Sequence, residues 1–106
     1  MKIERIKPDE VLVRFDSNPS AAMAQAWSEE IKSYLTGDEK LARVDLTELE
    51  IVSSLGVSVV VAIYRNMERQ GGTITVDVPN ESMLRVFELF GLTKLFETRV
   101  APPTSC

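Results

Sequence analysis

The stretch that decides the fold runs from Leu41 to Gly72 and reads LARVDLTELEIVSSLGVSVVVAIYRNMERQGG. It opens with an apolar segment, Leu41–Leu46, which predicts a mostly covered, central strand. A short acidic loop then leads to Ser53 and Ser54. A serine in this place can accept a hydrogen bond from a backbone N–H that the first helical turn leaves unpaired, so the pair predicts the start of a helix.

The segment from Ser54 to Gln70 carries conflicting signals. Its valines and isoleucine between Val57 and Ile63 favour a strand by propensity alone. Its length of about 17 residues, the serine cap and the glycine stop at Gly71 favour a helix. We therefore predict a helix that packs deeply against a sheet. Its predicted apolar face consists of Val57, Val60, Val61, Tyr64 and Met67.

Two short strands and a helix are predicted upstream of this stretch. Ile3–Lys7 and Val11–Phe15 have strand character, and Pro8 supplies the fixed φ of the turn between them. Asn18 and Pro19 then predict a helix start, with Asn18 as the cap and Pro19 at the first helical position. The predicted apolar face of this helix consists of Met23, Trp27, Ile31, Tyr34 and Leu35.

Downstream, Thr73–Val78 alternates apolar and polar residues, which predicts another strand. Asn80 caps a further helix, and Leu92–Phe96 predicts a short helical turn. The predicted apolar face of the last helix consists of Met83, Val86, Phe87 and Phe90. The order is therefore β-β-α-β-α-β-α. Two β-α-β units imply parallel strands with right-handed crossovers, so we predict an α/β fold with a mixed, mostly parallel sheet of four to five strands.

The composition is that of one globular domain. The chain has 106 residues, of which 44% are hydrophobic and 26% charged, and we expect residues 1–100 to form the domain and 101–106 a short C-terminal tail. A net charge of −4 argues against nucleic acid as a partner, because phosphate binding needs a basic patch. The single cysteine, Cys106, permits no internal disulfide and favours a reducing compartment.

Membrane and enzymatic functions find little support in the sequence. No apolar run approaches the ~20 residues of a membrane span, and the N-terminal segment has no signal-peptide pattern, so we expect a cytoplasmic protein without membrane insertion. The chain has no histidine, which excludes a Ser-His-Asp triad. Asp45, Glu48 and Glu50 are interpreted as solvated loop charges. We expect no catalytic residue, no metal and no cofactor.

Ser54 is the candidate functional residue. The start of a helix combines unpaired N–H groups with the positive end of the helix dipole, and this environment suits a phosphate. Sequence alone leaves two roles open for each serine, because Ser53 or Ser54 can be the cap and leave the other hydroxyl free.

Asp45 to Gly56 resembles the STAS domain, named after sulphate transporters and anti-sigma factor antagonists, whose pattern is roughly Asp-Leu-Ser-x-Val-x-Phe-Ile-Asp-Ser-Ser/Thr-Gly. In the free-standing bacterial members of the family a partner kinase phosphorylates the serine that Ser54 matches here. Gly56 follows the pattern, whereas Ser53 replaces an aspartate and Leu55 replaces the second hydroxyl residue. The resemblance continues over about residues 2 to 97.

The resemblance implies a STAS fold and a regulatory protein that resembles anti-sigma factor antagonists. Such a protein binds an anti-sigma factor/serine kinase-like partner and is switched by phosphorylation of Ser54. The partner-binding residues that the resemblance implies are Asp16, Ser53, Ser54, Leu55 and Gly56. The alternative is a STAS subunit that does not switch and belongs to a lipid-transport or stress-sensing assembly. Whether the domain forms a homodimer stays open.

Overall fold

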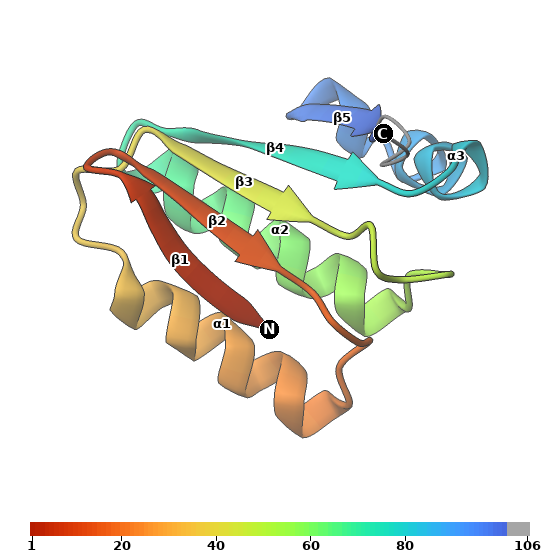
Figure 1. Cartoon of the computed structure of the whole chain (residues 1–106), viewed down its shortest axis with the longest axis horizontal. Helices are drawn as coiled ribbons and strands as arrows, with labels where there is room; N and C mark the ends of the chain where they lie inside the picture. Colours follow the sequence, from red (N-terminus) through yellow and green to blue (C-terminus); the bar gives the residue numbers. More distant parts are fainter. Residues whose placement is uncertain (102–106) are drawn as a thin grey trace, which may run out of the picture.

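The computed structural model describes residues 1–101, which form one five-stranded sheet, three α-helices and a short 3₁₀ helix (Figure 1). The strands are β1 (Lys2–Lys7), β2 (Glu10–Arg14), β3 (Leu41–Asp45), β4 (Thr73–Val78) and β5 (Glu97–Val100). The helices are α1 (Ala21–Tyr34), α2 (Ser54–Arg69), α3 (Glu81–Leu89) and the 3₁₀ helix η1 (Leu92–Lys94).

The strands lie in the sheet in the order in which they occur along the chain. β1 pairs antiparallel with β2, and the other neighbours are parallel. Each pair of parallel neighbours is joined by a crossover connection. Because every crossover leads to the next strand on the same side and is right-handed, the crossover helices lie on the same face of the sheet. α1 and α2 accordingly lie side by side on one face of the sheet, with α2 behind β2 and β3 in the view of Figure 1. The predicted α/β fold with a mixed, mostly parallel sheet is confirmed, and β5 is a strand that the sequence analysis did not anticipate.

The core lies between the sheet and the helices. Val13, Val44 and Val76 occupy one register row across β2, β3 and β4, and all three are fully buried. The buried side of α2 consists of Gly56, Val59, Val60, Ile63 and Met67. The helix prediction for this valine-rich segment is therefore correct. Its predicted face was rotated, because Val57, Val61 and Tyr64 are only half-buried at the sides of the helix.

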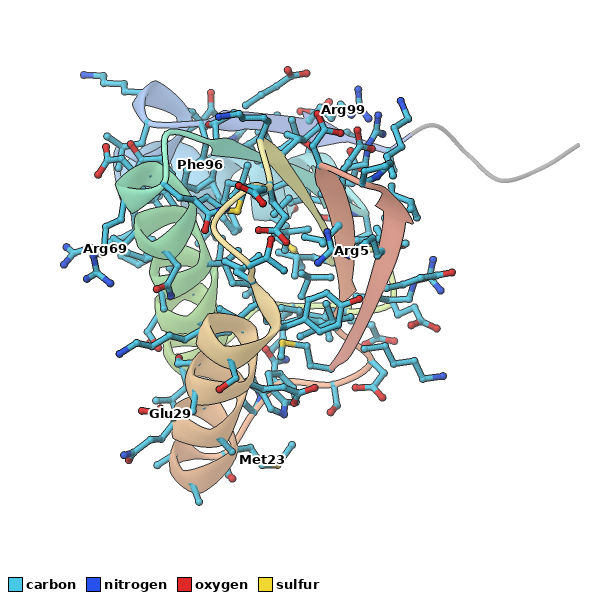
Figure 2. The ribbon with its side chains drawn as sticks, turned by 90° about the vertical axis from the view of Figure 1, so that its left-hand side faces the viewer. Arg5, Met23, Glu29, Arg69, Phe96 and Arg99 are labelled. Carbon is cyan, nitrogen blue, oxygen red and sulfur yellow. The ribbon has the colours of Figure 1, made fainter. Side chains whose placement is uncertain are left out.

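Three predictions about helix starts and helix faces are wrong, and they concern Asn18, Met23 and Phe90. α1 begins at Ala21, and its N-cap is Ser20, whose Oγ accepts a hydrogen bond from the N–H of Met23 at 3.2 Å. Asn18 is therefore not the cap. Met23 lies on the outer side of α1 (Figure 2), because Ala24, Trp27 and Ile31 make up the buried side of this helix. Phe90 at the end of α3 is likewise 61% exposed.

The opposite face of the sheet is polar. Three arginines there bind carboxylates, with Nε–oxygen distances of 3.2 Å for Arg14–Asp45, 2.7 Å for Arg43–Glu10 and 2.6 Å for Arg99–Asp77. No helix in the described part of the chain covers this face. The hydrogen bond from the N–H of Ala101 to the carbonyl of Val78 extends the β4–β5 pairing by one residue. The rest of the predicted tail, residues 102–106, lies outside the described residues.

A buried carboxylate joins three parts of the fold at the other end of the sheet. Glu39 is fully buried and accepts hydrogen bonds from Arg5 Nη2 at 2.7 Å and Gln70 Nε2 at 3.0 Å. The backbone N–H groups of Thr36 and Gly37 also donate to it. Burial raises the pKa of Glu39, but the hydrogen bonds from Arg5, Gln70 and Thr36 outweigh this effect and hold the pKa well below its usual range. Glu39 therefore stays ionised and ties β1 to the ends of α1 and α2.

We predict that Glu39→Gln lowers the free energy of unfolding at pH 7 by about 1–3 kcal/mol, because it removes the charge from a set of charge-assisted hydrogen bonds. The carboxylate contributes its full stabilisation above its usual pKa of 4.5, and this contribution is lost as the pH falls toward the lowered folded value. The gap between wild type and variant should therefore narrow below pH 4.5. Urea unfolding as a function of pH measures both effects.

The exposed residue Glu29 on the outer side of α1 provides the matched control (Figure 2). Glu29→Gln should change the free energy of unfolding by less than about 0.5 kcal/mol. Equal stabilities of wild type and Glu39→Gln at pH 7 would contradict the role of the buried carboxylate.

Candidate functional site

The loop between β3 and α2 is held at its start by Asp45. Asp45 Oδ1 accepts hydrogen bonds from the N–H of Thr47 at 2.8 Å and from Thr47 Oγ1 at 2.6 Å, while Arg14 Nε donates to Oδ2. Burial raises the pKa of Asp45, but the bonds from Thr47 and then Arg14 outweigh it and lower the pKa. The buried side chains of Leu46 and Leu49 fix the next residues. The loop therefore leaves the sheet in a defined direction.

The two serines have different roles. Ser53 is the N-cap of α2, and its Oγ accepts a hydrogen bond from the N–H of Gly56 at 3.0 Å. Ser54 is the first residue of the helix and is exposed, and no side-chain hydrogen bond occupies its hydroxyl within residues 1–101. The structure thus decides between the alternatives that the sequence left open: Ser53 caps the helix and Ser54 has the free hydroxyl.

Asn18 connects the loop after β2 to the loop before α2. Its Nδ2 donates to the carbonyl of Ile51 at 2.9 Å, and its Oδ1 accepts from the N–H of Ser53 at 2.9 Å. A Cβ on Gly56 would lie 3.1 Å from Asn18 Oδ1 and 3.1 Å from Val52 Cγ2. Gly56 therefore allows the start of α2 to approach Asn18 closely. Sequence reasoning missed this role of Asn18, because the partners lie 33 and 35 residues away along the chain.

Asp16 lies in the loop after β2, as predicted, but takes no part in this connection. Its Oδ1 lies 3.3 Å from the amino group of Met1, and the hydrogen bond from that group lowers the pKa of Asp16. We call the segment from Leu46 to Ser54 the Ser54 loop. Among the described residues, Asn18 and not Asp16 binds this loop. The two loops nevertheless leave the same edge of the sheet, because β2 and β3 are parallel and end in register at Arg14 and Asp45.

The loop that precedes Ser54 carries exposed apolar and acidic residues, and Leu55 follows Ser54. Ile51 is 73% exposed and Leu55 is 39% exposed, and Glu48 and Glu50 are exposed in the same loop. A hollow of about 100 Å³ beside the loop is smaller than the pockets that usually hold small-molecule ligands. Within residues 1–101 no cluster of three or more acidic or cysteine side chains could hold a metal ion. The arrangement can present a hydroxyl to another protein.

The sequence matches the profile of the family described as the Mlab STAS domain over residues 4–97. The match covers most of the chain, and the chain therefore belongs to this family. A search of curated protein sequences found no match. None of the helices formed by residues 1–101 has the length and apolar character needed to cross a membrane.

Solved structures share the fold. The anti-sigma factor antagonist SpoIIAA in its unphosphorylated form has a TM-score of 0.76 and 17% identity, with 92% of this chain and 85% of that chain covered. The phosphorylated form of SpoIIAA from Bacillus has a TM-score of 0.71 and 19% identity, with 92% and 88% covered. A chain of the stressosome, described as a signal integration and transduction hub, has a TM-score of 0.74 and 20% identity, with 93% and 87% covered. At these identities the likeness shows the STAS fold.

The separation of the two serine roles predicts unequal effects on stability. Ser53→Ala should lower the free energy of unfolding by about 1 kcal/mol, because it removes the acceptor for the N–H of Gly56. Ser54→Ala should change it by less than about 0.5 kcal/mol. Chemical denaturation of the two variants under one set of conditions measures the difference. Equal losses, or a larger loss for Ser54→Ala, would show that the assignment of the cap is wrong.

Proposed function

We propose that this STAS domain is a non-enzymatic regulatory module that binds another protein through the Ser54 loop and is switched by phosphorylation of Ser54. The observation that carries the proposal is the free, exposed hydroxyl of Ser54 beside a cap that Ser53 already provides. Because the cap is a separate residue, a modification of Ser54 leaves the hydrogen bond that starts α2 in place. A hydroxyl at the first position of a helix also lies near the positive end of the helix dipole, which favours a phosphate.

The proposed partner is an anti-sigma factor/serine kinase-like protein. The similarity to SpoIIAA, an anti-sigma factor antagonist for which both an unphosphorylated and a phosphorylated form are described, supports this choice. The proposed binding surface consists of Asp16, Ser53, Ser54, Leu55 and Gly56. Exposed Leu55 and neighbouring Ile51 provide apolar area around the hydroxyl. Burial of such area on binding is favourable, and introduction of a charge next to it is unfavourable.

Phosphorylation would add a strong negative charge to this surface. A phosphate brings a charge of −1.5 to −2 to Ser54. Exposed Glu48 and Glu50 in the same loop already make the surroundings acidic. A partner surface that fits the unmodified hydroxyl and apolar side chains would have to bury or repel this charge, at a cost of several kcal/mol. Such a cost corresponds to a loss of affinity of about a hundredfold or more.

A second candidate is a STAS subunit that stays in a multiprotein assembly without switching. Ser53 and Leu55 replace the aspartate and the second hydroxyl residue of the motif, and this departure favours a domain that is not a kinase substrate. The similarity to a stressosome chain also favours the assembly. The two candidates differ in whether Ser54 carries a phosphate.

The test uses Ser54→Asp and Ser54→Ala, expressed in the native cells with an affinity tag, with quantitative mass spectrometry of phosphate and of proteins that copurify. We expect phosphate on Ser54 in the wild type. We also expect a partner protein that copurifies with wild type and with Ser54→Ala. Its affinity for Ser54→Asp should be lower by about a hundredfold. Ser33→Asp, an exposed serine on α1, is the control for the added charge and should keep the partner.

The outcomes separate the two candidates. Partner binding that is equal in all variants, with no phosphate on Ser54, would show that the assembly subunit is correct and the switch is wrong. Ser53→Asp restores the residue of the motif and keeps a good N-cap, because aspartate caps helices as well as serine does. If the missing carboxylate limits the kinase reaction, this variant should be phosphorylated faster on Ser54.

A further inference from the structure

A groove lies between the C-terminal half of α2 and η1, away from the Ser54 loop. It has a volume of about 500 Å³, and we call it the α2–η1 groove; the side chains used below are Tyr64, Arg65, Glu68, Arg69, Leu92 and Leu95. Arg65 follows Ser54 by 11 residues on the same helix, so the two positions are about 16 Å apart along the helix axis. Eleven residues make about three full turns, so Arg65 and Ser54 lie on the same side of α2, and the groove is displaced along the helix from the surface proposed for the Ser54 switch.

The floor of the groove is apolar and firmly packed. Leu92 is buried, whereas Leu95 is 49% exposed and faces the groove. The ring of Tyr64 packs on Phe96 with centroids 5.4 Å apart, and Phe96 packs on Phe87 at 6.4 Å. Since Phe96 and Phe87 belong to the core, the aromatic contacts fix Tyr64 in place.

The rim of the groove carries two arginines without a carboxylate partner. Arg65 and Arg69 are four residues apart on α2, so they lie on the same side of the helix. Neither forms an ion pair within the described residues, and Arg69 Nη1 donates only to the neutral Asn66 Oδ1 at 3.3 Å. Figure 2 shows Arg69 extending from α2 into solvent. In a chain with a net charge of −4, this rim provides two guanidinium groups available to bind an anionic group.

Glu68 is the one carboxylate of residues 1–101 that lines the groove, so two arginines and one glutamate give the lining a formal charge of +1. Glu68 Oε2 accepts a hydrogen bond from Tyr64 Oη at 2.9 Å, and this bond raises the pKa of Tyr64. Arginines on the open face of the sheet differ from those of the groove, because Arg14, Arg43 and Arg99 all bind carboxylates of neighbouring strands. The structure therefore leaves Arg65 and Arg69 available to a ligand.

We propose that the α2–η1 groove docks an acidic peptide segment of a partner protein, with two carboxylates on Arg65 and Arg69 and an apolar side chain on Leu95 and Tyr64. Guanidinium groups bind carboxylates through two parallel hydrogen bonds, which gives both affinity and orientation. Two cations one helical turn apart match two acidic side chains that point the same way from a peptide. The charge complementarity selects an acidic occupant, and the apolar floor selects one with an exposed hydrophobic residue.

The probe is a phage-displayed library of random dodecapeptides, selected on the intact protein. We expect enrichment of peptides that combine aspartate or glutamate with a leucine or an aromatic residue. Amide shifts in NMR spectra of the labelled protein should cluster at Tyr64, Arg69 and Leu95. The affinity of the enriched peptides should fall at least about tenfold when both arginines are replaced by glutamate, Arg65→Glu with Arg69→Glu.

Two further variants make the test specific. Arg85→Glu reverses the same charge on the exposed surface of α3 and should leave peptide binding unchanged. Leu95→Ser removes the exposed apolar contact, keeps both arginines and should weaken binding. Enriched peptides without acidic residues, equal binding to the double variant, or shifts at the Ser54 loop instead would overturn the proposal. Binding of ATP in the groove without any enrichment of acidic peptides would also overturn it.

Discussion

The parallel pairing of β2, β3 and β4 is the constraint on which the rest of the structure depends. It places Val13, Val44 and Val76 in one buried row and requires a crossover helix after each strand. It also makes the loops that follow β2 and β3 leave the sheet at the same edge. Only because of this arrangement can Asn18 reach the backbone of Ser53 and hold the start of α2. The position of the Ser54 hydroxyl thus depends on the pairing of the strands as well as on its own loop.

Local patterns predicted most of the fold, because the signals of strand, cap and turn agree along the chain. The valine-rich helix α2 shows which signals dominate. Its caps and its length predicted a helix, although its valines favour a strand by propensity. These valines pack against the sheet. The strand β5 was missed because its sequence, Glu-Thr-Arg-Val, is short and has three polar residues out of four. Such a composition is usual for an edge strand, which has a neighbour on only one side.

Only those features of the candidate site that depend on neighbouring residues in the sequence could be predicted. The pattern placed Ser54 at a helix start but did not separate its role from that of Ser53, because serine caps equally well at either position. At the start of α1 the sequence predicted Asn18 as the cap, whereas the structure has Ser20 in this role. Both residue types are good caps, and the contact that removes Asn18 from this role comes from 33 to 35 residues away. Distant partners of this kind leave no signal in a single sequence.

The position of each strand within the sheet also determines how firmly the two candidate surfaces are held. The Ser54 loop follows β3, which has neighbours on both sides, so the first residues of the loop are attached to the centre of the sheet. The α2–η1 groove has one wall that precedes β5, a strand bonded to β4 alone. Edge segments open at lower free energy than central strands, and their amide hydrogens exchange with solvent sooner. Only the η1 side of the groove, and not its packed floor, thus lies next to a segment that opens more easily than the centre of the sheet.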